Sequence, residues 1–173
     1  MRPFAPALAA LVLAGTLVTP AAAQSTSTDT ANGSVTIVQP LTVTRVSDLS
    51  FGRIVKPTAG SGSVVLANTA DTVSAGSGAV ALAGISTTRA RFDIAGEGGQ
   101  LVTLTVPASV SLANSTNAIT VTLSPSLAPS YQLSGTLGSS VTDALYVGGS
   151  FSLPSTQASG LYTGQFSVTA AYQ

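Results

Sequence analysis

Apolar and polar residues alternate along most of the chain after its first 23 positions, and no segment there has the three-to-four-residue spacing of an amphipathic helix. Segments rich in Val, Ile, Thr, Tyr and Phe are separated by turn-forming clusters, which is typical of short half-buried strands. The expected strands are Ser34–Gln39, Leu41–Val46, Leu49–Ile54, Ser63–Ala67, Ala79–Leu82, Thr88–Ile94, Gln100–Val106, Ala118–Ser124, Tyr131–Leu137, Ala144–Val147, Ser150–Leu153 and Leu161–Tyr172. The expected turns lie at Ala59–Gly62, Gly76–Gly78, Gly96–Gly99, Asn114–Asn117 and Gly148-Gly149. This pattern predicts an all-β fold, either a sandwich or a barrel.

The first 23 residues have a different pattern, that of a cleavable signal peptide. Arg2 supplies a positive start, Ala7–Val18 is a short apolar run, and Ala21–Ala23 are small residues before Gln24. The run is too short for a membrane-spanning helix, which needs about 20 residues. We therefore expect an exported protein with no membrane span after signal removal. Its parts would be a signal peptide over 1–23, a flexible N-terminal extension over 24–39 (the leader) and a β-sandwich domain over 40–173.

Charge and composition narrow the classes of partner. After residue 23 the chain has five basic and six acidic residues, and Lys56 is its only lysine. Nucleic-acid binding needs clustered Lys and Arg, so we expect no nucleic-acid partner. The chain has no Cys, so the sandwich must fold without disulfides. A net charge near zero favours self-association, which suits a subunit that stacks on its own copies.

The sequence offers little catalytic chemistry. It has no His and no Cys, which removes the usual general base, thiol nucleophile and transition-metal ligands. Asp93 and Glu97 are the closest pair of carboxylates, and they alone support a secreted hydrolase as a minor hypothesis. Arg89 and Arg91 share a strand face, where a surface charge pair with Asp93 is expected. We predict a non-enzymatic protein with no catalytic, cofactor-binding or metal-binding residues.

The C-terminal segment, Gly160–Gln173, carries the longest alternation in the chain. One face is predicted to hold its bulky apolar residues with two glycines in the same register: Gly160, Tyr162, Gly164, Phe166, Val168, Ala170 and Tyr172. Such a strand suits the centre of a core, and it equally suits a sheet edge that awaits a partner.

These residues resemble a known pattern. A penultimate Tyr172, with Gly160 fourteenth from the end, is similar to the C-terminal motif of chaperone–usher fimbrial (pilin) subunits. The Leu-x-Phe-Gly-x-Ile run at Leu49–Ile54, the Gly148-Gly149 pair and the Gly-x-Tyr-x-Gly-x-Phe-x-Val-Thr run from Gly160 together resemble an uncharacterised family of secreted bacterial β-sandwich proteins. That family is similar to fimbrial subunits and spore-coat-type proteins. The chain departs from many pilins in that it cannot form their disulfide.

The resemblance implies a fold and a mechanism. Such subunits are immunoglobulin-like sandwiches that lack one strand, and a donated strand completes them by β-augmentation. A periplasmic chaperone and an outer-membrane usher would be partners, the product would be a homo-polymer (a pilus), and the chain would pass through the periplasm to the cell surface or the medium. By position, Gly160–Tyr172 would border an assembly groove, and Val35 and Ile37 would be the apolar residues of the donor strand.

Two alternatives stay open at this stage. Pro40 cannot donate to a β-ladder, so Leu41–Val46 can be either a continuation of the donor or the first strand of the body. The second alternative is functional, namely a self-complete secreted adhesin or glycan-binding sandwich. It would use Tyr131, Tyr146 or Phe151 to stack on sugars, although core packing is the more ordinary role for these side chains.

Overall fold

The structure, a computed structural model, describes residues 26–173, so the predicted signal peptide lies outside the described part. The chain divides into two units, Met1–Val35 and Thr36–Gln173, and every strand belongs to the second. The strands are β1 (Thr42–Ser47), β2 (Ile54–Val55), β3 (Ser61–Leu66), β4 (Val73–Gly76), β5 (Val80–Ala81), β6 (Ala90–Glu97), β7 (Leu101–Thr105), β8 (Ser109–Asn114), β9 (Asn117–Pro125), β10 (Ser130–Gln132), β11 (Ser140–Pro154) and β12 (Thr169–Tyr172). No helix occurs among residues 26–173, and hence none that could cross a membrane.

The strands form an antiparallel β-sandwich, which confirms the all-β fold predicted from the alternation and the sandwich implied by the resemblance. One sheet has the order β1-β6-β11-β3-β4 and also includes β8 and β9; a second has the order β10-β7-β12, and β2 pairs with β5. The fully buried core comes from alternate residues of these strands, and its largest side chains are Leu66, Ile94, Leu133, Leu145, Val64, Val102, Val121 and Val147. The period-two pattern therefore gives the core face correctly.

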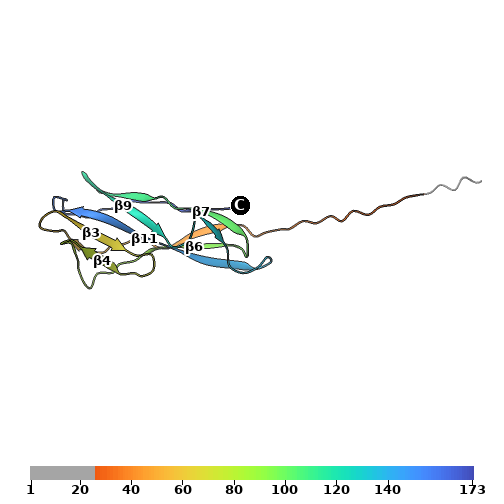
Figure 1. Cartoon of the computed structure of the whole chain (residues 1–173), viewed down its shortest axis with the longest axis horizontal. Coiled ribbons are helices and arrows are strands. Elements are labelled where there is room, and N and C mark those ends of the chain that lie inside the picture. The colour runs from red at the N-terminus through yellow and green to blue at the C-terminus, as the bar shows by residue number, and fades with distance from the viewer. Residues whose placement is uncertain (1–25) are drawn as a thin grey trace, which may run out of the picture. The chain divides into compact units, whose positions relative to one another are not determined.

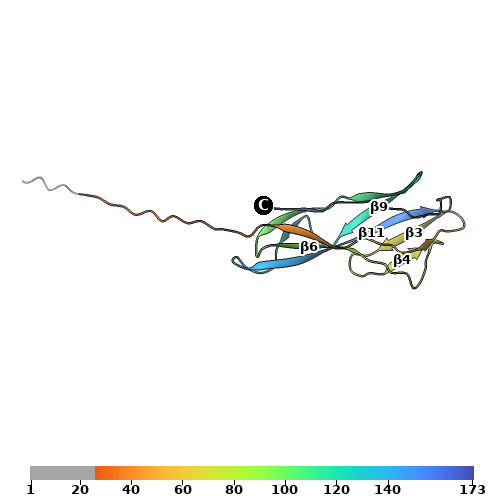
Figure 2. The same cartoon turned by 180° about the vertical axis from the view of Figure 1, so that it is seen from behind.

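Strand β11 is the longest element and joins the two ends of the main sheet. Its first half pairs with β6, and its second half pairs with β3 on one side and β9 on the other. Figures 1 and 2 show β3 and β4 at one end of this strand and β6 at the other. The predicted turn at Gly148-Gly149 is wrong, because both glycines lie inside β11.

The two glycines serve close packing rather than a turn. A Cβ on Gly148 would lie 2.3 Å from the Leu66 carbonyl oxygen and 2.7 Å from the Asn68 nitrogen. A Cβ on Gly149 would lie 2.8 Å from the Val121 side chain. Only glycine lets β11 pass this close to its neighbours.

Gly148→Ala is therefore expected to destabilise the fold. The backbone atoms that the new methyl group meets cannot rotate away, and overpacking of this kind costs about 1–3 kcal/mol. Urea denaturation followed by circular dichroism measures the change. Gly33→Ala is the matched control, because nothing lies within 4 Å of a Cβ there. Equal midpoints for the two variants would contradict this account of β11.

Other sequence predictions need correction at particular elements. Strands β4 and β8 lie in stretches that are predicted to be loops. The strand predicted over Leu49–Ile54 is not formed: Ile54 is the first residue of the two-residue strand β2, and Ser50 makes one isolated bridge to Thr88. The long C-terminal strand is also wrong as stated, since β12 covers only Thr169–Tyr172. A regular strand needs a ladder partner along its length, and within residues 26–173 Gly160–Val168 has only the bridge from Thr163 to Ala113.

Candidate functional site

The C-terminal segment, residues 160–173, lies along one edge of the second sheet. Its last residues pair with β7, from Thr169 opposite Thr105 to Tyr172 opposite Val102. Before them, only Thr163 makes a bridge, exchanging two backbone hydrogen bonds with Ala113 of β8 at 2.8 and 3.0 Å. Among residues 26–173, no backbone hydrogen bond is made by Gly164–Val168. This stretch is extended chain with its pairing groups free.

Strand alternation directs part of the free groups of this segment away from β7 and β8. Backbone N–H and C=O groups alternate in direction along a strand. Thr163, Thr169 and Gln173 direct theirs toward β8 and β7, so the even-numbered residues between them direct theirs to the open side. Across that opening lies β1, which pairs with β6 on one edge and with no described strand on the other. Two unpaired sheet edges therefore face each other.

A groove lies beside the C-terminal segment, and β1 borders it only through Arg45 and Ser47. It consists of two adjoining hollows of about 710 Å³ and about 350 Å³, which share Leu49, Leu112 and Gly164 in their walls. We call it the edge groove. Apolar side chains of the main sheet, of the Leu49–Val55 stretch and of the C-terminal segment are exposed in it, with polar residues beside them: the apolar ones are Leu49, Phe51, Ile54, Phe92, Val110, Leu112, Ile119, Phe151, Leu153 and Phe166. Core side chains are thus accessible through a slot where a further strand would fit.

Polar contacts mark the limits of the edge groove. At one end the Lys56 ammonium donates to the Gln157 carbonyl (2.9 Å) and links the two walls. Near the other end Arg45 and Asp48 form an exposed ion pair on the rim. Phe166 packs edge-on against Phe92 with a centroid distance of 5.9 Å, which holds the C-terminal segment over the core. The walls are therefore fixed at several points although their edges are unpaired.

The predicted groove residues fall into two sets. Gly160, Tyr162, Gly164 and Phe166 line the edge groove. Val168, Ala170 and Tyr172 lie beyond it, where they pack against the core from β12 and the residue before it. The opposite wall, built from Leu49–Lys56, and the lining residue Leu112 of β8 are both absent from the sequence prediction of the groove. The strand signal at Leu112 is a short alternation of Val110 and Leu112, and this stretch is predicted to be a loop although the Asn114–Asn117 turn that joins β8 to β9 is predicted.

The predicted donor residues have no strand structure in this chain. Residues 26–41 make no strand, and Val35 and Ile37 are 84% and 86% exposed. Strand β1 begins at Thr42, which makes Leu41–Val46 the first strand of the body rather than part of a donor. Exposed aliphatic side chains on a segment without pairing are unfavourable in water unless a partner covers them.

Comparison with known proteins gives one family. Residues 41–172 match the family described as "Domain of unknown function (DUF4402)". The chain belongs to this family. No curated protein and no solved structure matches the chain. The matched region begins immediately before β1 and ends at Tyr172, so the leader lies outside the DUF4402 domain.

The DUF4402 domain contains a buried polar cluster at the point where the leader joins β1. Glu97 is its centre and is 2% exposed. The backbone N–H of Gln39 donates to Glu97 Oε2 (3.2 Å), and that of Gly138 donates to Glu97 Oε1. The Tyr172 hydroxyl accepts from the Glu97 N–H (2.8 Å) and donates to the Gln39 carbonyl (2.9 Å). The sequence prediction missed this role of Glu97, since a lone Glu in a glycine-rich turn reads as a solvated residue.

The two carboxylates of the hydrolase hypothesis have separate partners. Asp93 accepts from the Arg91 guanidinium (2.8 Å), as predicted for a surface charge pair, while Glu97 is held by backbone N–H groups. Among the described residues, no three acidic side chains gather closely enough to hold a metal ion.

The three aromatic residues considered for sugar stacking also have partners. Tyr131 and Phe151 pack against the core, as predicted, and Phe151 meets Phe51 edge-on at 5.0 Å. The prediction of core packing is wrong for Tyr146, which does not pack against the core. Its ring lies under the Arg89 guanidinium, 4.1 Å from the ring centroid, in a cation–π contact.

Asp71 holds Arg89 in that position and gives a pH-dependent prediction. The Arg89 side chain donates to the Asp71 carboxylate (3.0 Å), and with the backbone N–H of Arg89 it holds the pKa of Asp71 below its ordinary value. A lowered pKa in the folded state stabilises the fold above the ordinary pKa, and this contribution is lost as the pH falls through the folded-state value. Asp71→Asn should lower the unfolding temperature at pH 7, by an amount worth at most about 1 kcal/mol for a partly exposed pair. The difference from wild type should shrink at pH 3; an equal difference at both values would contradict the prediction.

Proposed function

We propose that this protein is a non-enzymatic structural subunit of a cell-surface filament or coat, assembled by β-strand donation between copies. The leader of one copy enters the edge groove of the next and completes its sandwich. The observation that carries the proposal is the edge groove, which exposes apolar side chains beside two stretches that lack a strand partner, residues 160–168 and the outer edge of β1.

The groove has the chemistry that an added strand requires. The even-numbered residues of the C-terminal segment offer free backbone groups on the same side as the hollow, and strand addition uses such groups for affinity. Their side chains are only partly buried, whereas Val102 and Leu104 of neighbouring β7 are 0% and 4% exposed. An inserted strand would cover this incompletely buried face.

The leader has the matching chemistry. Val35 and Ile37 are two residues apart, so in an extended strand they lie on one face. Ala31 and Gly33 continue that face, while Thr36 and Val38 lie on the other. Full burial of two aliphatic side chains contributes about 3–6 kcal/mol before association costs. Ladder hydrogen bonds along both edges would add to this.

Export and assembly factors belong to the same proposal. A chain with an open apolar groove and an exposed leader is prone to premature association at low net charge. A periplasmic chaperone that lends a strand to the groove would prevent this, and an outer-membrane usher would exchange it for the next leader. The proposed location is accordingly the cell surface or the medium, reached through the periplasm.

Removal of the leader tests the proposal. The chain from Gln24 should form oligomers whose size grows with concentration, and the chain from Pro40 should remain a monomer, as measured by light scattering after size-exclusion chromatography. A chain from Gln24 that is monomeric and unfolds at the same temperature without its leader would overturn the proposal. That outcome would favour the self-complete adhesin instead.

A further inference from the structure

The root of the leader is fixed to the body at one residue, Gln39. Both backbone groups of Gln39 are hydrogen-bonded, the N–H to Glu97 and the C=O to the Tyr172 hydroxyl. Tyr172 is tied in turn to the Glu97 N–H. We call Glu97 and Tyr172 together the root clamp. Ile37, two residues before Gln39, is 86% exposed, so the chain is free almost immediately beyond this point.

The surroundings of the root clamp favour keeping Gln39 bound. The Glu97 carboxylate is buried with no cation within bonding distance among the described residues, and a buried charge is costly unless hydrogen bonds stabilise it. Two backbone N–H groups, from Gln39 and Gly138, meet that need. Gly96 allows Tyr172 to approach, because a Cβ there would lie 2.6 Å from the Tyr172 hydroxyl. Release of Gln39 would leave a buried carboxylate oxygen without its donor.

In a subunit assembled by strand donation, as proposed above, the leader could enter the groove of its own chain, and the root clamp acts against this. A leader joined to its own body has an effective concentration in the millimolar range at its own groove. Self-occupation would therefore compete strongly with donation to another copy, unless the fold prevents it.

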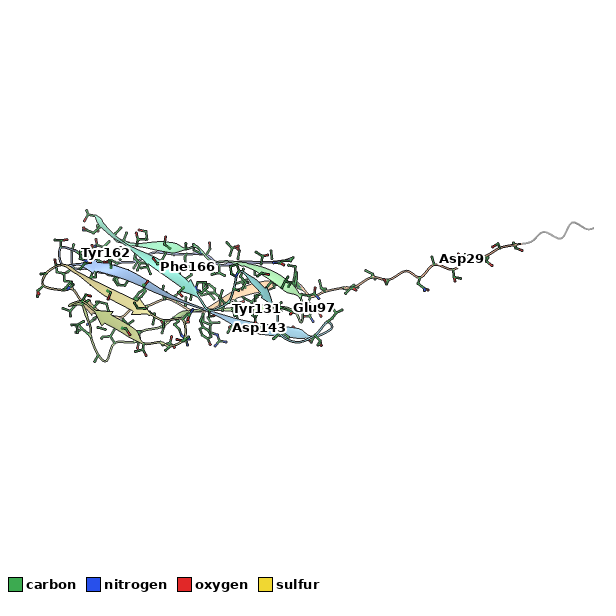
Figure 3. All side chains as sticks on the ribbon, viewed as in Figure 1. Asp29, Glu97, Tyr131, Asp143, Tyr162 and Phe166 are labelled. Carbon is green, nitrogen blue, oxygen red and sulfur yellow. The ribbon has the colours of Figure 1, made fainter. Side chains whose placement is uncertain are left out.

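Self-occupation would require a tight hairpin just before β1. The leader would turn at Pro40 and Leu41 and run back beside β1, with Gln39 opposite Thr42. Two-residue hairpin turns need a positive φ at their first residue, and proline is fixed near −65°. Gln39 would also have to exchange its bonds with Glu97 and Tyr172 for bonds to β1. Figure 3 shows Glu97 at the opposite end of the body from Tyr162, so the edge groove extends away from the root.

We infer that the root clamp, together with Pro40, keeps the leader out of its own groove and so makes it available to another copy. Glu97 and Tyr172 are positioning residues in this inference, which rests on the proposed function. Neither residue lies in the groove walls.

The test compares two variants on a Pro40→Gly background, which removes the obstacle at the turn. Tyr172→Phe removes the hydroxyl that holds Gln39. Tyr146→Phe is the matched control, because Tyr146 lies outside the groove walls and its hydroxyl makes no hydrogen bond among the described residues, while the ring that packs under Arg89 is kept. The chain has no Cys, so Ser34→Cys and Ser167→Cys give two unique spin-label sites. Labelled chains are diluted in excess unlabelled chain, so that measured distances lie within one chain.

We expect electron spin resonance to detect a short-distance population in the Tyr172→Phe chain and none in the Tyr146→Phe chain. Equal distributions in the two chains would overturn the inference, as would a short-distance population already present with Tyr172 intact. A separate arm measures binding of a peptide of residues 30–39 to the full-length chain carrying Val35→Asp and Ile37→Asp. Binding there without the Tyr172-dependent change would refute the clamp and leave strand donation standing. No binding would refute the proposed function itself.

Discussion

A full-length chain carrying Val35→Asp and Ile37→Asp is expected to be a stable monomer that no longer donates its leader. Each substitution removes an aliphatic side chain worth about 1.5–3 kcal/mol on burial and places a carboxylate at an apolar site. A loss of about 3–6 kcal/mol corresponds to two to four orders of magnitude in the dissociation constant, at about 1.4 kcal/mol per factor of ten. Sedimentation velocity over a range of concentrations measures the change.

The leader itself provides the control for this experiment. Thr36→Asp with Val38→Asp adds the same charge to the opposite face of the same segment, which a donated strand would turn toward solvent. Assembly of this control should be close to wild type. If both double variants lose assembly equally, the effect comes from charge and not from burial of the Val35 and Ile37 face. The unfolding temperature of the monomer, measured at a concentration too low for assembly, should be unchanged in both, since these side chains are exposed in the single chain.

The second large effect is expected at the acceptor. Leu112 lies in both hollows of the edge groove and packs only partly against the core. Leu112→Trp would place a larger ring into the space that the donor's side chains need. This variant should fail to bind the 30–39 peptide, while overpacking lowers its own stability by no more than about 1–3 kcal/mol. Isothermal titration calorimetry measures the binding.

Leu101→Trp separates groove filling from general destabilisation. Leu101 of β7 is 44% exposed and lies outside the groove walls, so the same change of residue there should leave peptide binding intact. Peptide binding by Leu112→Trp with wild-type affinity would contradict the assignment of the edge groove as the acceptor.

Many of the strands can be predicted from the local alternation of the sequence, whereas features that depend on tertiary contacts cannot. The alternation in Ser63–Ala67, Gln100–Val106 and Ala118–Ser124 gives β3, β7 and β9 because each has one buried face. Gly148-Gly149 misleads the prediction, since two glycines favour a turn locally while the need for close approach to Leu66 is a tertiary property. No single-sequence pattern contains that information.

The candidate site divides in the same way. The face of Tyr162 and Phe166 can be read from the C-terminal alternation, because the spacing of two is a local signal. The opposite wall depends on which strand lies across the core, and Leu49 and Leu112 are more than sixty residues apart in sequence. The root clamp joins Gln39, Glu97 and Tyr172 from three distant segments, so only the fold brings these residues together.

The central claim is that one copy's leader occupies another copy's groove, and mixing two defective chains tests it most directly. The Val35→Asp/Ile37→Asp chain can accept a leader but not donate one, and the Leu112→Trp chain can donate but not accept. Each alone should be a monomer by multi-angle light scattering, and an equimolar mixture should give a complex with the mass of one copy of each and nothing larger. A mixture that stays monomeric, or either chain assembling alone, would contradict strand donation between copies.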